Sequence, residues 1–254
     1  MAGVAFTDGP LIARLTLERP EALNALDEAM AESFAAAARR ARRSRARVLI
    51  LEGRGRSFCA GGDLDFIERN RRRPARALAA RMRAFYGAFL SVRELPQIVL
   101  AKVQGAAYGA GLCLALAADL RAAADDARLS LNFARLGLNP GMAAWPLARA
   151  AVGEARAREL LASARAFSGA DLAAWGGALA FPAAALDAEV ERLAAVIAAN
   201  SGAALRAIKA ETRIGEELAP FLAFESRAQA RLFRGPDLAE GVAAARQRRA
   251  PRFA

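Results

Sequence analysis

The sequence contains no histidine among its 254 residues. This absence excludes Ser-His-Asp triads, Cys-His pairs and nearly all familiar zinc sites. Any proton transfer has to use a carboxylate, lysine, tyrosine, cysteine or water. The two cysteines, Cys59 and Cys113, lie far apart and form no Cys-x-x-Cys motif, which argues against a disulfide framework or a zinc ribbon. We therefore expect no metal site and no redox chemistry.

Long hydrophobic runs are also missing. Apolar residues make up 55% of the chain, but no stretch of about 18 apolar residues is free of charge, which argues against a membrane span. The segment from Met1 to Leu15 has neither a basic start followed by an apolar stretch nor a small-residue cleavage site. The expected location is the cytoplasm. The length suits one domain with a helical appendage.

The formal charge of +11 comes from 37 Lys and Arg against 26 Asp and Glu. Arginines cluster at 39–47 and 69–73, and no aromatic residues are interleaved with them for base stacking. Nucleic acid is therefore not the expected partner. A solvated basic surface, with some arginines available to the phosphates of an anionic cofactor, fits the pattern better.

Apolar patterning predicts an α/β fold. Strands are expected at 11–17, 47–51 and 97–103, with shorter ones at 120–124 and 128–131. Asp27 is predicted to cap a helix that reaches Arg43, and another helix should run from Pro74 to about Arg93. Beyond Pro140 the pattern is mostly helical, with helices predicted at 143–151, 154–162, 169–175, 187–200, 203–217, 220–234 and 236–248. Strand-helix units followed by helices alone indicate an α/β core with a helical C-terminal part, divided near residue 190.

Two glycine-rich turns each follow an apolar strand, at 57–64 and 104–111. Neither matches a dinucleotide-binding or P-loop motif, so phosphate binding is not the natural interpretation. Small residues at a helix start let a ligand approach free backbone N–H groups, and two such turns together would make a paired donor site for a developing oxyanion. Tight packing between strand and helix would explain each turn equally well.

Five segments, taken in order, resemble the crotonase superfamily of enoyl-CoA hydratases and isomerases. They are 19–26, 58–64, 104–119, 137–141 and the ending 235–253. The resemblance spans essentially the whole chain. It implies a spiral of ββα units at 1–190 that carries an acyl-thioester site, and a helical oligomerisation or lid region at 191–254. It also implies a homotrimer or dimer of trimers that binds a bent acyl-CoA or a carrier-protein thioester. Coenzyme A would be part of the substrate, with no other cofactor.

Carried over by position, the resemblance makes the backbone N–H groups of Gly62 and Ala110 the two oxyanion donors. Ala110 stands where the family usually has glycine, but a backbone donor survives this change. Asp63 has a second interpretation as a helix N-cap, and Tyr108 either donates near the acyl group or packs. The residues implied to line the adenine and pantetheine path are Ala22, Leu23, Ala25, Ala60, Gly61, Asp63, Leu64 and Tyr108.

The chain departs from the family at its acid positions. Hydratases of this family use two glutamates to hold and activate water, but the matching positions here are Cys113 and Phe133. Gly141 occupies a third position where some isomerases and dehalogenases place an aspartate. A thiol and a phenyl ring cannot deprotonate water as a carboxylate pair does, so ordinary hydration is doubtful. Phe133 and Trp145 are expected either to shape an apolar acyl pocket or to pack in the core. The alternative functions are an isomerase, a decarboxylase of the polyketide β-branching type, or a catalytically silent thioester-binding scaffold.

Overall fold

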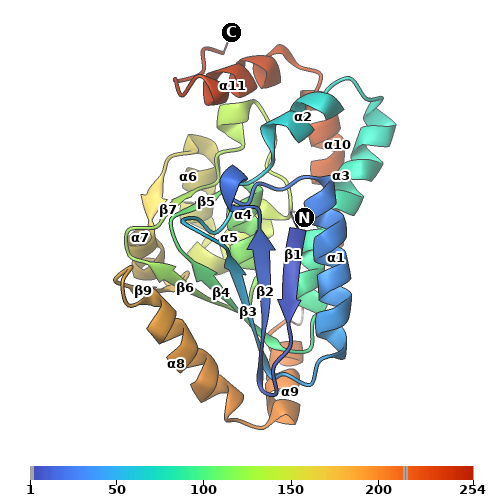
Figure 1. Cartoon of the computed structure of the whole chain (residues 1–254). Helices are drawn as coiled ribbons and strands as arrows, with labels where there is room; N and C mark the ends of the chain where they lie inside the picture. The colour runs from blue at the N-terminus through green and yellow to red at the C-terminus, as the bar shows by residue number, and fades with distance from the viewer. Residues whose placement is uncertain (1–2, 214, 216, 254) are drawn as a thin grey trace.

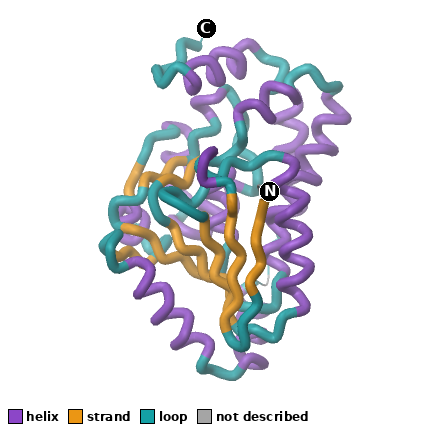
Figure 2. Tube along the Cα trace, viewed as in Figure 1, coloured by secondary structure: helices purple, strands orange, loops and turns teal. Residues whose placement is uncertain are grey.

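A mostly parallel sheet of six strands runs through the centre of the molecule, with a three-stranded sheet beside it (Figures 1 and 2). The structure is a computed structural model that describes residues 3–213, 215 and 217–253. The large sheet has the spatial order β1 (Gly3–Thr7), β2 (Ile12–Glu18), β3 (Val48–Gly53), β4 (Ile98–Val103), β6 (Leu120–Ala124) and β9 (Leu179–Phe181). The small sheet has the order β5 (Ala106–Tyr108), β7 (Arg128–Ser130) and β8 (Phe167–Ser168).

Helices surround both sheets and continue beyond them to the C-terminus (Figure 1). They are α1 (Glu28–Arg43), α2 (Leu64–Asn70), α3 (Ala75–Leu90), α4 (Ala110–Ala117), α5 (Ala144–Val152), α6 (Glu154–Ser163), α7 (Gly169–Ala174), α8 (Leu186–Ala198), α9 (Gly202–Thr212), α10 (Ala219–Leu232) and α11 (Pro236–Arg246). Short 3₁₀ helices cover Pro20–Ala22, Ser91–Glu94 and Ala134–Leu136.

The core forms where the sequence is most continuously apolar. The centre of β3 is fully buried and pairs in parallel with β4, with Val48 opposite Ile98. Strands buried on both faces are expected to be hydrophobic, as β3 is from Val48 to Leu51 and β4 is from Ile98 to Ala101. The side chain of Asp27 accepts a hydrogen bond from the Met30 amide at 2.8 Å, which confirms the predicted helix cap. From α1, Phe34 then packs against a ring of α3, with centroids 5.2 Å apart.

The α/β class is confirmed, and most predicted strands and helices lie close to those observed. The helix predicted at 203–217 ends at Thr212, and positions 214 and 216 of that prediction lie outside the described residues. Four strands were not anticipated: β1, β5, β8 and β9. The last three have only two or three residues each, too few for an alternating pattern to appear. The helix predicted from Pro74 to Arg93 ends earlier, at Leu90, and continues as a 3₁₀ turn.

The C-terminal helices are joined closely to the sheet. The boundary expected at residue 190 lies inside α8, which contacts β2, β3, β4 and β6. Lys209 of α9 donates to the Gln97 carbonyl at 2.7 Å and pairs with Asp119 at 2.7 Å. Within the described ranges no single helix is long and apolar enough to cross a membrane, although the bent pair of α8 and α9 meets that test jointly by length and composition.

Candidate functional site

The two glycine-rich turns meet at one edge of the large sheet. Because β3 and β4 are parallel, the segments that follow them emerge at the same edge. They then pair with each other: the Phe58 amide donates to the Gln104 carbonyl at 2.8 Å, and the Tyr108 amide donates to the Cys59 carbonyl at 3.0 Å. The carboxyl ends of parallel strands are where α/β proteins place their ligands.

Glycine is required at the points where the two turns contact each other. Gly61 has a φ of +93°, and a Cβ there would lie 2.5 Å from the Tyr108 carbonyl oxygen. At Gly111 a Cβ would lie 2.2 Å from the Cys59 carbonyl oxygen. Both distances are far below van der Waals contact, so any side chain would force the turns apart. Glycine therefore sets the spacing between the two turns.

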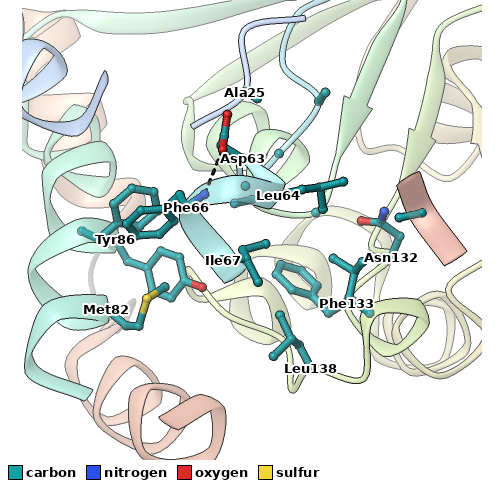
Figure 3. A pocket seen from close by; sticks show the side chains of 18 of the residues that line it. Ala25, Asp63, Leu64, Phe66, Ile67, Met82, Tyr86, Asn132, Phe133 and Leu138 are labelled. Carbon is teal, nitrogen blue, oxygen red and sulfur yellow. Dashed lines mark hydrogen bonds between the residues drawn. The ribbon is translucent and has the colours of Figure 1, made fainter. Parts of the chain in front are cut away.

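An apolar cavity of about 360 Å³ opens beside this contact (Figure 3). This volume is in the range of small-molecule sites. Helices α2 and α3 supply much of its aromatic and aliphatic wall. The lining residues are Ala22, Ala25, Ala60, Gly61, Gly62, Asp63, Leu64, Phe66, Ile67, Met82, Phe85, Tyr86, Gly109, Ala110, Asn132, Phe133, Leu136, Leu138, Phe233 and Ala245.

The backbone amides of Gly62 and Ala110 lie on the cavity wall and have no acceptor among the described residues. Gly62 sits in a bridge with Leu26 whose hydrogen bonds use the Gly61 carbonyl and the Asp63 amide, so the Gly62 amide is not consumed. Ala110 is the first residue of α4, where the amide has no partner in its own helix. Within the described part of the chain neither amide donates to a carbonyl. Both are available to an oxygen atom of a ligand.

Asp63 serves as a helix cap at the cavity entrance. Its carboxylate accepts from the Phe66 amide at 2.9 Å (Figure 3). It also accepts from Arg19 at 2.9 Å. Burial acts to raise the pKa of Asp63, but the Phe66 amide and Arg19 outweigh it and the net shift is downward. Arg19 also pairs with Asp27 at 3.0 Å, so a single guanidinium joins the caps of α1 and α2.

None of the three family acid positions carries an acidic residue. Phe133 lines the cavity, whereas Cys113 is fully buried behind it, with its Sγ 3.7 Å from the Gly141 carbonyl oxygen. Burial raises the pKa of Cys113 well above its ordinary value, so the thiol stays protonated. At Gly141 a Cβ would lie 2.5 Å from the Tyr86 hydroxyl and 2.4 Å from the Gln229 side-chain nitrogen. The space of the third acid is thus filled by Tyr86 and Gln229.

Most residues implied for the substrate path line this cavity, with two exceptions. Leu23 has a left-handed backbone with φ of 51°, and its carbonyl accepts from the Ala60 amide at 2.9 Å, so it shapes the turn. The Tyr108 side chain lines a neighbouring recess that shares Asn132 and Leu136 with the cavity. The expected acyl-pocket residue Trp145 is also absent from the wall; it packs beside Arg149 and Arg158.

A buried polar cluster behind the cavity was not anticipated. The Tyr86 hydroxyl donates to Gln229 Oε1 at 2.8 Å. One turn away on α10, Glu225 Oε2 accepts from the Ala143 amide at 2.8 Å, while its Oε1 is buried with no hydrogen-bond partner in the described part of the chain. Burial raises the pKa of Glu225 from its ordinary 4.5 to about 7, against the lowering effect of the Ala143 and Ala144 amides. This carboxyl therefore holds its proton at mildly acidic pH.

Glu225 gives the fold a specific pH dependence. Since its folded pKa lies above the unfolded one, the native state keeps a proton that the unfolded chain loses between about pH 4.5 and pH 7. The free energy of unfolding should fall across this window by up to about 3 kcal/mol. Replacing Glu225 with glutamine removes that contribution, so calorimetry should show the variant gaining Tm relative to the parent as pH rises.

The matched control for this prediction is Glu32→Gln on the exposed face of α1. Its Tm difference from the parent should stay constant over the same window. The other titratable groups facing Glu225 are Tyr86 and Cys113, whose pKa values are both raised, so neither ionises there. A Tm difference for Glu225→Gln that does not change with pH would contradict the assignment.

Among the described residues, no group of three or more Cys, Asp or Glu side chains is arranged to hold a metal ion. The site consists of an apolar cavity, two free amides and one capped carboxylate. Chemically, this arrangement suits a neutral chain ending in a carbonyl whose oxygen lies between the amides. The fold and the cavity thus define an α/β protein with an apolar cavity of small-molecule size at its strand ends.

Comparison with known proteins agrees with this class. Residues 9–254 match the family model for enoyl-CoA hydratase/isomerase. A probable enoyl-CoA hydratase of Rhodobacter capsulatus is 38% identical over 248 residues, which cover 95% of this chain and 94% of that protein. A putative enoyl-CoA hydratase/isomerase of Bacillus subtilis is 30% identical and covers 100% and 99%. A crystal structure of an enoyl-CoA hydratase from Mycobacterium avium subsp. paratuberculosis superposes with a TM-score of 0.88 at 31% identity, covering 100% and 99%.

The chain belongs to the enoyl-CoA hydratase/isomerase family. The resemblance of its five sequence segments to the crotonase superfamily is confirmed.

Proposed function

We propose that the protein binds an acyl-CoA thioester with its carbonyl oxygen between the Gly62 and Ala110 amides and stabilises the thioester enolate there. Support for this comes from the two free amides on the wall of one apolar cavity. Amides fixed by their own backbone need no reorganisation as negative charge develops on the oxygen, which makes them effective in a dry site. The resulting class of activity is that of a lyase or isomerase acting on the carbon next to the carbonyl.

Glutamate-assisted hydration is not part of the proposal. Asp63 is the one carboxylate in the described cavity wall, and its oxygens are already engaged by Arg19 and the Phe66 amide. Because the Asp63 carboxylate is already engaged, a second candidate is favoured, a thioester-binding protein without turnover. We also propose that the protein lies in the cytoplasm and assembles as a homotrimer or dimer of trimers. Large apolar side chains exposed on the C-terminal helices, such as Ile208 and Phe224, are suited to subunit contacts.

Two thioesters test the proposal and separate its candidates. We expect crotonyl-CoA to bind, detected by calorimetry, without loss of its enoyl-thioester absorbance, because the described cavity wall offers no free carboxylate to activate water. Rapid loss of absorbance would show that hydration occurs and would contradict our interpretation of the empty acid positions. Movement of a double bond in a 3-enoyl-CoA, seen as a gain of the same absorbance, would favour the isomerase over the silent binder.

A further inference from the structure

Three cations lie around one carboxylate at the C-terminal end of α4. Asp119 Oδ1 accepts from Arg213 Nε at 3.1 Å, and its Oδ2 pairs with Lys209 at 2.7 Å and accepts from the Val99 amide at 2.8 Å. The third cation, Arg121, hydrogen-bonds only to backbone carbonyls among the described residues. Asp119 is the one described carboxylate that pairs with any of these cations, so it balances one positive charge of three.

Burial makes the excess charge unfavourable. The side chains of Lys209 and Arg213 are only 6% and 18% exposed. Burial lowers the pKa of Lys209 and that of Arg121; the nearby Arg213 adds to the effect in both cases, and Asp119 opposes it. Each cation therefore disfavours the charge of its neighbours. Since a buried charge is stable only when it is paired, a further anion would stabilise the cluster.

The end of α4 balances part of this charge. Arg121 donates to the Ala118 carbonyl at 2.9 Å, and Arg213 donates to the Ala117 carbonyl at 3.5 Å. The C-terminus of a helix carries roughly half a negative elementary charge. This amount is well short of the two unpaired positive charges. Capping of α4 therefore explains why cations lie here, but it leaves most of their charge unbalanced.

A small recess opens beside the cluster. Its volume is about 190 Å³, below the roughly 300–1,000 Å³ of most sites for organic ligands. None of its described lining residues also lines the apolar cavity. The polar ones are Arg93, Asp119, Arg121, Thr212 and Arg213.

Two guanidinium groups at this recess have unused N–H groups. The hydrogen bonds of Arg121 to described residues come from its Nε and Nη1, and none of them uses Nη2. Arg213 Nη1 is buried with no hydrogen-bond partner in the described part of the chain. A buried donor without a partner costs free energy, so both groups favour a ligand that supplies oxygen acceptors.

We infer that this recess, between α4, α5 and α9, is a binding site for inorganic phosphate held by Arg121 and Arg213. Guanidinium groups donate paired hydrogen bonds to oxyanions, and a phosphate dianion brings both the acceptors and the charge that the cluster lacks. Both oxygens of Asp119 are covered by donors, so the phosphate contacts N–H groups rather than the carboxylate. Because Arg213 directly follows α9 and Arg121 belongs to β6, the bound ion links the C-terminal helices to the large sheet.

Thermal unfolding at about pH 8, where phosphate is a dianion, tests this inference. At tenfold excess over its Kd, sodium phosphate should raise the Tm by about 3–6 °C relative to sodium chloride of equal ionic strength, and the rise should saturate. Arg213→Gln and Arg121→Gln should each abolish the rise, whatever their own Tm in chloride. The matched control is Arg206→Gln, which removes an exposed positive charge from α9 and should keep the full rise. Titration calorimetry of the parent measures the Kd without any variant.

Phosphate also stabilises proteins in general, because it is excluded from their surface, and that effect grows steadily with concentration. A steady rise that Arg213→Gln shares with the parent, or no rise at all, would overturn the inference. Adenosine 3′,5′-bisphosphate supplies the same group on a larger molecule and should give no rise that depends on Arg213. A larger Arg213-dependent rise with this nucleotide would identify an organic phosphate as the ligand and overturn the inorganic assignment. These outcomes are independent of the proposed function, because the recess and the apolar cavity are separate.

Discussion

Replacing Gly62 with proline is expected to lower kcat/KM for any thioester that the protein turns over by about 10²–10³-fold. Proline has no amide hydrogen, so one of the two proposed donors to the thioester oxygen disappears. The remaining donor, at Ala110, cannot hold the developing charge alone. Steady-state kinetics on the best substrate found would measure the loss. Acetoacetyl-CoA, which forms an enolate with its own absorbance, gives a binding readout even in the absence of turnover.

The matched control is Gly62→Ala, which keeps the amide hydrogen. A Cβ at this position would lie 3.3 Å from the end of the Ile67 side chain, which can move by the small amount needed. The alanine variant should therefore retain most of the activity and bind the acetoacetyl-CoA enolate. If proline and alanine reduce both readouts equally, the effect comes from the added volume, and the amide of Gly62 is not a donor.

The second large effect concerns Asn24, a fully buried residue that is hydrogen-bonded to the first glycine-rich turn. Its side-chain oxygen accepts from the Arg19 amide at 2.9 Å, and its NH₂ group is shared by three carbonyls, including those of Ser57 at 2.9 Å and Phe58 at 3.2 Å. Asn24→Ala leaves these groups buried and poorly paired. The expected loss is about 3 kcal/mol, a decrease in Tm of about 6–12 °C for a chain of this size.

Backbone strain must be separated from the loss of hydrogen bonds, because Asn24 has a φ of 57°. Glycine adopts this conformation without penalty, so Asn24→Gly isolates the hydrogen-bond contribution. We expect Asn24→Gly to recover only about 1 kcal/mol relative to Asn24→Ala. Calorimetry of both variants measures the two free energies of unfolding and so separates backbone strain from the loss of hydrogen bonds. If the Asn24→Gly variant were as stable as the parent, the side-chain network would contribute nothing.

Local sequence patterns were enough to predict the elements that depend on local physics. The Asp27 cap, the buried strands β3 and β4 and the C-terminal helices all carry their own periodic or capping signal. The free amides of Gly62 and Ala110 were also expected from the glycine-rich turns and the family resemblance. What the turns alone could not show is that a backbone bridge, between Cys59 and Ala107, brings them together.

The polar cluster behind the cavity could not be predicted in the same way. Tyr86 and Gln229 are 143 positions apart, and each looks locally like one residue of an ordinary amphipathic helix. Their meeting depends on how α10 packs against α3. Glu225 gives no signal either, since a lone glutamate in a helix is usually exposed. The sequence showed that position 141 carries glycine instead of an acid. It could not show that Tyr86 and Gln229 fill the space where that acid would lie.

The bare contact between the two turns has a consequence for divergence within the family. Gly61 and Gly111 leave no room for even a methyl group, whereas Phe133, at one of the family acid positions, lines the cavity. Substitutions are therefore poorly tolerated in the backbone that presents the amides and better tolerated in the side chains of the cavity wall. A descendant can exchange the side chain at the Phe133 position of the cavity wall, and so change the chemistry of the wall, while the contact between the two turns passes on intact.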